Sequence, residues 1–251
     1  MKIAVCGKGG SGKSTVVALL AQEALHRGYE VLVVDSDESN AGLSGTLGFS
    51  EPPLPLLDFV GGREGLKQKM GKPNIFSLAQ ITTADIPGEY MPAGNGLRMV
   101  AVGKILHALE GCACPMGALN REFLKKLSLG EKEIAIVDME AGIEHFGRGI
   151  EKGLDSVLIV VEPPLESINV AAKVHELASD IGVNNIWAVL NKIPSEKIAT
   201  RLKEELQSRR INVAGSLHYN EQIFDASLEG KIPAERPEEM GRIFDRIIPG
   251  K

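Results

Sequence analysis

The segment GKGGSGKS at residues 7–14 constrains the fold more than any other part of the sequence. It matches the pattern G-x-x-x-x-G-K-[ST], follows an apolar run at 2–6, and precedes a helical pattern. Glycines allow backbone N–H groups to turn inward around phosphate oxygens, and a helix that begins there adds the positive end of its dipole. The segment therefore predicts a strand, a phosphate-binding loop and a helix, with Lys13 reaching the β- and γ-phosphates and the Ser14 hydroxyl ligating Mg²⁺. A glycine-rich turn without a ligand is disfavoured by this strand–loop–helix context.

Short apolar runs alternate with amphipathic stretches along the rest of the chain. We expect strands at 2–6, 30–35, 97–103, 133–138, 156–162, 186–191 and 212–217, and a weaker candidate at 74–80. Several of these runs are apolar throughout, as parallel strands are when helices cover both faces of the sheet. The alternation predicts an α/β fold: a doubly wound, mostly parallel sheet of about seven to eight strands with helices on both faces.

Two helices can be placed from their spacing. Apolar residues recur at helical intervals after Ser14, and Gly28 is a typical stop. Ser195 is a typical N-cap for a second helix, which has a single apolar stripe. The stripe contains Ile198, Leu202 and Leu206.

Length and composition suit one domain spanning residues 1–251, with an irregular, Pro- and Gly-rich insertion around 50–75. The net charge of −5 argues against general nucleic-acid binding, which normally shows a basic excess. No apolar run approaches the roughly 20 residues of a membrane span. We expect no signal peptide, because the first residues lead directly into the glycine-rich loop. The odd number of cysteines, three, favours a reducing cytoplasm.

Aspartates follow two of the expected strands. Asp35 and Asp37 lie in VVDSDES, and would share one side if the strand continued; Asp138 lies in IVDMEAGIEH. Carboxylates beside a nucleotide can hold Mg²⁺ through water or orient an attacking water. Either Asp35 or Asp37 could instead be a helix cap or a turn residue, and Asp138 could be an ordinary aspartate at a strand end.

A second lysine, Lys8, lies inside the loop, where by itself it could be a solvated surface charge. In this setting the loop resembles the deviant Walker A motif of the MinD/ParA and nitrogenase iron-protein class of ATPases. The resemblance implies that Lys8 contacts the phosphates of a partner subunit in an ATP-sandwiched homodimer. It also implies that Asp37 positions the attacking water, that Asp35 lies beside Mg²⁺, and that Asp138 begins a switch segment in which Gly142 senses the γ-phosphate. The expected nucleotide-binding residues of the loop are Gly9, Gly10, Ser11, Gly12, Lys13, Ser14 and Thr15.

The segment LNKIP at 190–194 looks like the guanine signature N-K-x-D with its last residue changed. Pro194 has no acceptor for guanine, whereas the amide of Asn191 can still bond to the adenine amino group or N7. ATP is therefore favoured over GTP. Residues 217–221, LHYNE, follow a later strand, and the resemblance implies backbone contacts to the base there.

The pair Cys112 and Cys114 in EGCACPMG could be a metal clamp, a redox pair or two buried thiols. One such pair supplies two thiolates, whereas a tetrahedral Zn²⁺ site generally takes four ligands. Two pairs across a twofold axis would form an S₄ site that suits Zn²⁺ or Ni²⁺. Cys6 lies in the first strand and is expected to be a core residue. Conceivable additional ligands, for which a structural role is the alternative, are Met116, His107 and His145.

Four segments together closely resemble the CooC-type ATPases, which are nickel-insertion accessory proteins of carbon monoxide dehydrogenase. They are the loop at 7–14, the Asp-x-Asp at 35–37, the Cys-x-Cys at 112–114 and the DMEAGIEH segment at 138–145. The resemblance implies an ATP-hydrolysing cytoplasmic homodimer that holds nickel or zinc for a nickel-enzyme client, which is expected to be carbon monoxide dehydrogenase.

Two other functions compete with this hypothesis. A role in partitioning on DNA or membranes would need a basic face or a basic amphipathic C-terminal helix, whereas the ending PEEMGRIFDRIIPGK mixes both charges. An iron–sulfur, ATP-driven electron-transfer protein of the nitrogenase type is the main alternative. That family has a second ligand cysteine soon after the switch aspartate, and no cysteine follows Asp138 here. Two Cys-x-Cys pairs could nevertheless still hold a cluster.

Overall fold

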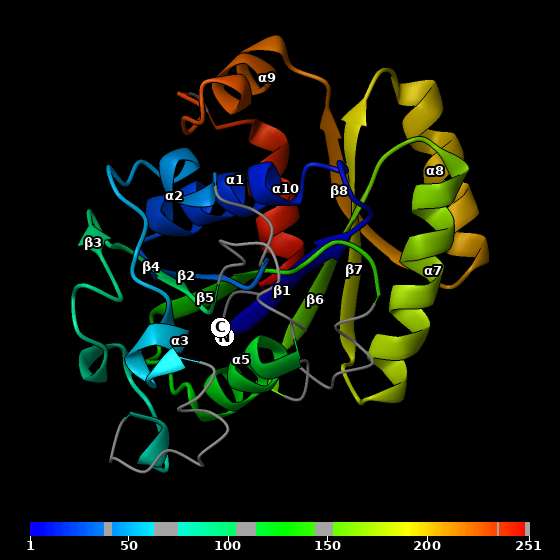
Figure 1. Cartoon of the computed structure of the whole chain (residues 1–251). Coiled ribbons are helices and arrows are strands. Elements are labelled where there is room, and N and C mark those ends of the chain that lie inside the picture. The colour runs from blue at the N-terminus through cyan, green and yellow to red at the C-terminus, as the bar shows by residue number, and fades with distance from the viewer. Residues whose placement is uncertain (38–41, 63–74, 104–113, 144–152, 235, 249–251) are drawn as a thin grey trace.

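The computed structural model describes residues 1–37, 42–62, 75–103, 114–143, 153–234 and 236–248. In these residues an eight-stranded sheet has the order β3-β4-β2-β5-β1-β6-β7-β8 (Figure 1). Its strands are β1 (Lys2–Gly7), β2 (Glu30–Asp35), β3 (Ala93–Gly94), β4 (Leu97–Ala101), β5 (Glu133–Asp138), β6 (Ser156–Val161), β7 (Asn185–Ile193) and β8 (Asn212–His218). Neighbouring strands are parallel, except that β3 pairs antiparallel with β4. The predicted mostly parallel, doubly wound sheet is confirmed.

Helices cover both faces of this sheet. They are α1 (Lys13–His26), α2 (Leu43–Thr46), α3 (Leu56–Phe59), α5 (Cys114–Lys126), α7 (Leu165–Asp180), α8 (Glu196–Ser208), α9 (Glu221–Leu228) and α10 (Glu238–Ile247). Ile3 and Val5 belong to the core shared with α1, α2 and α10. Ala4 and Cys6 belong to the core shared with α5, α7 and α8. Alternate side chains of β1 therefore pack into two separate apolar layers.

Local sequence explains where the predicted helices begin and end. The chain leaves α1 through Gly28, whose φ of 80° lies in the left-handed region that suits glycine. At the start of α8 the Ser195 hydroxyl accepts a hydrogen bond from the Ile198 N–H, at 3.4 Å. Leu202 and Leu206 of that helix are buried, which confirms the predicted stripe.

The weaker strand candidate at 74–80 is wrong. A 3₁₀ helix, η1 (Ile75–Ser77), lies within the segment. Ile75 and Phe76 are buried, and the Phe76 ring lies 6.4 Å from the ring of Phe123 in α5. Lys126 of the same helix donates a hydrogen bond to the Phe76 carbonyl. The apolar residues therefore pack against α5, and they do not add to the sheet.

Some boundaries also differ from expectation. Strand β4 ends at Ala101, and β7 extends to Ile193 with register shifts along its pairing with β8. Within the expected insertion at 50–75, helix α3 is present and residues 63–74 lie outside the described part. A second 3₁₀ helix, η2 (Thr83–Asp85), follows η1. In the described ranges no helix is long and apolar enough to cross a membrane.

Candidate functional site

The loop at 7–14 lies between β1 and α1, at the carboxyl edge of the central parallel strands. Two glycines of the loop are required because atoms of neighbouring strands approach them closely. A Cβ on Gly7 would lie 2.5 Å from the carbonyl oxygen of Val160, and one on Gly12 would lie 2.4 Å from Nδ2 of Asn191. Gly12 also has a φ of 90°. The loop can therefore lie directly against β6 and β7 only because these residues lack side chains.

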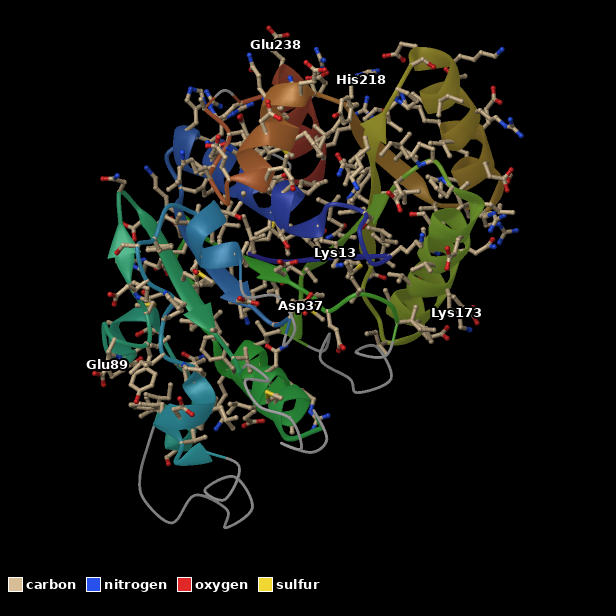
Figure 2. All side chains as sticks on the ribbon, turned by 45° about the horizontal axis from the view of Figure 1, so that its top comes forward. Lys13, Asp37, Glu89, Lys173, His218 and Glu238 are labelled. Atoms are coloured by element: carbon tan, nitrogen blue, oxygen red, sulfur yellow. The ribbon has the colours of Figure 1, made fainter. Side chains whose placement is uncertain are left out.

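Helix α1 begins at Lys13, and Gly12 at its N-cap supplies no side-chain hydrogen bond. The N–H groups of the first turn and the dipole of the helix are thus directed at the loop, as an anion site requires. Lys13 is only 7% exposed. Figure 2 shows Lys13 and Asp37 near the centre of the molecule. The geometry is that of a phosphate-binding loop.

Three carboxylates lie beside the loop. Asp35 ends β2 and Asp138 ends β5, and the two residues are paired in register across these neighbouring strands. The Ser14 hydroxyl donates a hydrogen bond of 2.8 Å to Oδ2 of Asp138. Asp37 follows the end of the strand, and its backbone N–H donates to Oδ1 of Asp35 at 3.2 Å. Strand β2 ends at Asp35 and does not continue to Asp37. All three aspartates are buried.

Asp138 is the electrostatically unusual group in this cluster. Burial raises the pKa of Asp138 to about 7; the hydrogen bond from Ser14 and the charge of Lys13 oppose the rise, while Asp35 and Asp37 add to it. Its Oδ1 is buried and makes no hydrogen bond among the described residues. A hydroxyl beside carboxylate oxygens is the hard donor set that Mg²⁺ prefers. The arrangement therefore fits a Mg²⁺ ion bound together with phosphate oxygens.

The expected switch segment lies against the loop. The Gly142 N–H donates a hydrogen bond of 3.2 Å to the Gly7 carbonyl, and Gly142 has a φ of 97°. A Cβ on Gly9 would lie 3.7 Å from Cβ of Ala141, so the two segments are in contact there as well. A change in the loop on phosphate binding can thus reach this segment directly.

A pocket of about 150 Å³ opens beside the start of α1. Its lining includes Thr15, Asn191 and residues 217–220, which sequence reasoning assigned to the nucleotide, and Ile223 and Phe224 of α9, which it missed. The Tyr219 and Phe224 rings lie 6.0 Å apart. Asn191 donates from Nδ2 to the Ser11 carbonyl at 2.8 Å, so in this structure the side chain expected at the base also supports the loop. The pocket is mostly apolar, as a site for a flat heteroaromatic ring is.

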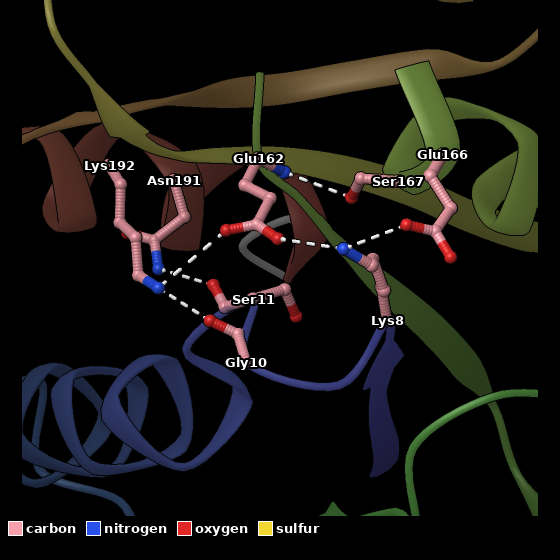
Figure 3. Close-up of polar contacts among 8 residues, drawn as sticks. All are labelled: Lys8, Gly10, Ser11, Glu162, Glu166, Ser167, Asn191 and Lys192. Atoms are coloured by element: carbon pink, nitrogen blue, oxygen red, sulfur yellow. Dashed lines mark hydrogen bonds and ion pairs between the residues drawn. The ribbon is translucent and has the colours of Figure 1, made fainter. Parts of the chain in front are cut away.

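Lys8 and Lys192 both form ion pairs with the carboxylate of Glu162 (Figure 3). The Lys8 ammonium lies 3.0 Å from Oε2 of Glu166 and 3.7 Å from Oε1 of Glu162. The hydrogen bond to Glu166 is the main reason that the pKa of Lys8 is raised. Lys192 lies 3.6 Å from Oε2 of Glu162 and donates to the Gly10 carbonyl at 2.5 Å. Sequence reasoning did not assign Glu162, Glu166 or Lys192; the only signal was the Asn-Lys dipeptide at 191–192.

The expected thiolate site falls mostly outside the described residues. Cys112, His107 and His145 lie there, and Cys114 is the first residue of α5. Met116 is 1% exposed and belongs to a core cluster, and so does Cys6, whose expected core position is confirmed. Within the described ranges, no group of three or more His, Cys, Asp and Glu side chains could hold a metal ion.

A family model described as the CobQ/CobB/MinD/ParA nucleotide binding domain matches residues 2–234. The chain belongs to this family. The resemblance to the MinD/ParA class is thereby confirmed.

Known members show where the chain lies within the family. It is 44% identical over 201 residues to an uncharacterized ATP-binding protein of Methanocaldococcus jannaschii, covering 78% of this chain and 80% of that protein. It is 37% identical over 199 residues to the carbon monoxide dehydrogenase accessory protein CooC of Rhodospirillum rubrum, covering 78% of this chain and 75% of that protein.

Solved structures of the family share the fold. MinD of Aquifex aeolicus has a TM-score of 0.68 at 20% identity, over 100% of this chain and 97% of that one. MinD of Pyrococcus horikoshii, solved with Mg-ADP, has a TM-score of 0.69 at 17% identity, over 99% and 96%.

Proposed function

We propose that this chain is an ATPase that forms a homodimer around ATP, binds Ni²⁺ or Zn²⁺ through Cys112 and Cys114 of two chains, and supports nickel insertion into carbon monoxide dehydrogenase. The observation that carries the proposal is the 37% identity to a carbon monoxide dehydrogenase accessory protein. The Cys-x-Cys pair in the sequence supports the metal part of the proposal.

The site supports ATP hydrolysis through residues with separate roles. Lys13 and the N–H groups at the start of α1 hold the phosphates, and Ser14 with Asp35 and Asp138 holds Mg²⁺. When bound, Mg²⁺ supplies positive charge to the phosphate oxygens. Asp37 orients a water whose oxygen forms a bond to the γ-phosphorus, while the bond to the β,γ-bridging oxygen breaks. The products are ADP and inorganic phosphate.

The pocket beside α1 supports adenine as the base. Asn191 offers an amide, and Tyr219 with Phe224 offers aromatic surface next to it. Lys8 contacts the phosphates of the partner chain when two copies meet. The two-chain arrangement also brings two Cys-x-Cys pairs together, which converts two thiolates into four. A site built from reduced thiolates would suit a reducing cytoplasm.

The decisive experiment counts metal in Cys112→Ser and Cys114→Ser. The wild-type protein is expected to bind one Ni²⁺ or Zn²⁺ per dimer, and each variant is expected to lose that metal while it still binds ATP. Mass spectrometry of metal content and a fluorescent-nucleotide titration measure the two properties. Cys6→Ala is the matched control, because Cys6 is buried in the first strand and should leave metal binding intact.

Two results would contradict the proposal. If the variant with both Cys112 and Cys114 replaced by serine still binds one nickel per dimer tightly, these two cysteines are not the metal ligands. Anaerobically purified protein that contains iron and absorbs visible light would favour an iron–sulfur electron-transfer protein instead.

A further inference from the structure

The side chain of Lys8 is surrounded by acceptors of its own chain. Glu162 directly follows β6, and Glu166 lies in the first turn of α7. Both carboxylates approach the Lys8 ammonium, at 3.7 Å and 3.0 Å (Figure 3). The side chain of Lys8 is 28% exposed, so its charge is partly removed from solvent while these carboxylates face it.

The two acceptors differ in how firmly they are held. Glu162 is 16% exposed, its backbone N–H donates to the hydroxyl of buried Ser167 at 3.1 Å, and its second oxygen faces Lys192. Lys192 is itself hydrogen-bonded to the loop at Gly10. Glu166 is 73% exposed, and its carboxylate pairs with Lys8. Glu162 is therefore the fixed acceptor, and Glu166 is the acceptor that a substitution can remove with little disturbance.

We propose that Glu162 and Glu166 are positioning residues for Lys8, which hold its ammonium within its own chain and thereby weaken dimerisation. The inference rests on the proposed function, in which Lys8 binds the phosphates of the partner chain. In this proposal the Lys8 ammonium makes one set of contacts or the other. Closure of the dimer is therefore an exchange, in which each Lys8 leaves two carboxylates and gains phosphate oxygens.

The size of the effect follows from the exposure of the contact. An exposed ion pair shifts an equilibrium by about 1.5- to 5-fold. Each dimer releases two such pairs, so the substitution Glu166→Gln is expected to lower the protomer concentration at half-dimerisation by about 2- to 25-fold. Glutamine keeps the shape of the side chain and removes only its charge.

The first measurement concerns the separate chain without nucleotide. The rate at which an amine-acylating reagent labels Lys8, followed by peptide mass spectrometry, reports how strongly its ammonium is held. Glu166→Gln is expected to label faster at Lys8, because the main cause of the raised pKa of Lys8 is gone. Glu176→Gln is the matched control: it lies on the same helix and removes an ion pair to Lys173 of 2.8 Å. Its Lys8 labelling should equal that of the wild type, and equal rates in all three proteins would overturn the proposal.

The second measurement is light scattering across a protomer dilution series with a non-hydrolysable ATP analogue. Glu166→Gln should dimerise at lower concentration than wild type and than Glu176→Gln. In a Lys8→Ala background, adding Glu166→Gln should change self-association no further, since the residue acts through Lys8. An effect that persists in that background would overturn the positioning role. A wild-type chain that stays monomeric would overturn the proposed dimer together with the exchange. If the wild type dimerises, and Glu166→Gln and Glu176→Gln dimerise at the same protomer concentration as the wild type, only the exchange would be overturned.

Discussion

Asn191 and Lys192 hold two successive loop carbonyls, those of Ser11 and Gly10, from a single strand end. A planar trans peptide carries its C=O and N–H on opposite sides. Drawing the Ser11 carbonyl toward β7 therefore directs the N–H of Gly12 to the other side of the loop, where phosphate is expected. Lys192 has a φ of 56°, a left-handed conformation that costs a non-glycine residue about 1 kcal/mol. The strained residue lies where β7 shifts register against β8.

Asp138 gives a pH prediction. Burial raises the pKa of Asp138 to about 7, from an ordinary value near 4, so between these values the folded protein binds more protons than the unfolded chain. The free energy of unfolding should therefore fall as pH rises through that window, by up to about 4 kcal/mol. Asp138→Asn cannot ionise and should remove most of this fall. Urea unfolding at about pH 5 and about pH 8, without nucleotide or Mg²⁺, covers the upper part of this window, where a fall of roughly 3 kcal/mol is expected.

The control for this prediction is Asp180→Asn, because Asp180 is exposed at the end of α7 and should keep the wild-type pH profile. If Asp138→Asn loses as much stability as wild type between the two pH values, the buried carboxyl is not the source of the pH dependence.

At this scale, sequence predicted the residues that lie close together in the chain. Lys13 and Ser14 follow from one motif, and Asp35 and Asp138 follow from the ends of apolar strands. Glu162 also ends an apolar run, but neither its contact with Lys8 nor the contact of Lys192 with the loop could be found in this way. Lys192 is 182 residues from its carbonyl partner, so only the three-dimensional fold brings the two together.

Helices α9 and α10 show how similar short elements have different tasks. Helix α10 buries Met240, Ile243, Phe244 and Ile247, and its Phe244 ring lies 5.9 Å from that of Tyr29. Helix α9 buries no residue, and its Phe224 ring is 47% exposed beside the proposed base pocket. Mixed charges in the sequence argued against a membrane role for the C-terminal helix, and in the structure its apolar face is already occupied by the core.

The same substitution on the two helices separates these tasks. Phe244→Ala should lower the free energy of unfolding by about 3 kcal/mol and leave ATP affinity unchanged, because it opens a cavity in the core. Phe224→Ala should change stability by less than about 1 kcal/mol and weaken ATP binding several-fold, because it removes aromatic surface from the pocket. Urea unfolding and fluorescent-nucleotide titration measure both variants. Wild-type ATP affinity in Phe224→Ala would show that the base binds elsewhere.

Elements with a regular period and a cap were predictable, whereas elements defined by packing were not. Helix α8 follows from its Ser195 cap and its stripe of apolar residues. The short β3 has two residues, too few to show a period. The segment at 74–80 has apolar residues that resemble a strand, but Phe76 and Ile75 are buried under α5, which no local pattern reveals.

The loop at 7–14 lies beside two central strands, and the proposed metal site needs the Cys-x-Cys pairs of two chains. If ATP and metal each bind the dimer more tightly than the separate chain, they must be coupled, and the coupling must be reciprocal. The factor by which an ATP analogue tightens Ni²⁺ binding should equal the factor by which Ni²⁺ tightens analogue binding.

Titrations of each ligand in the presence and absence of the other measure the two factors, with light scattering to assign the oligomeric state. Cys112→Ser should abolish the coupling and keep analogue binding. Equal Ni²⁺ affinity with and without the analogue would mean that the metal does not bridge two chains.

Strand β1 lies in the middle of the sheet, and this has a consequence for biosynthesis. Its partners in register are β5, where Lys2 pairs with Ala135, and β6, where Ile3 pairs with Ser156. The loop that follows β1 gains its supports at residues 191 and 192 later still. Strand β1 is therefore synthesised well before both of its partners and must wait for β5 and β6 before it can pair, and closing such distant contacts is slow. A chain halted midway has the complete phosphate-binding motif in its sequence but neither of these neighbouring strands nor the loop supports, so the loop can take its final form only after residue 192 has been made.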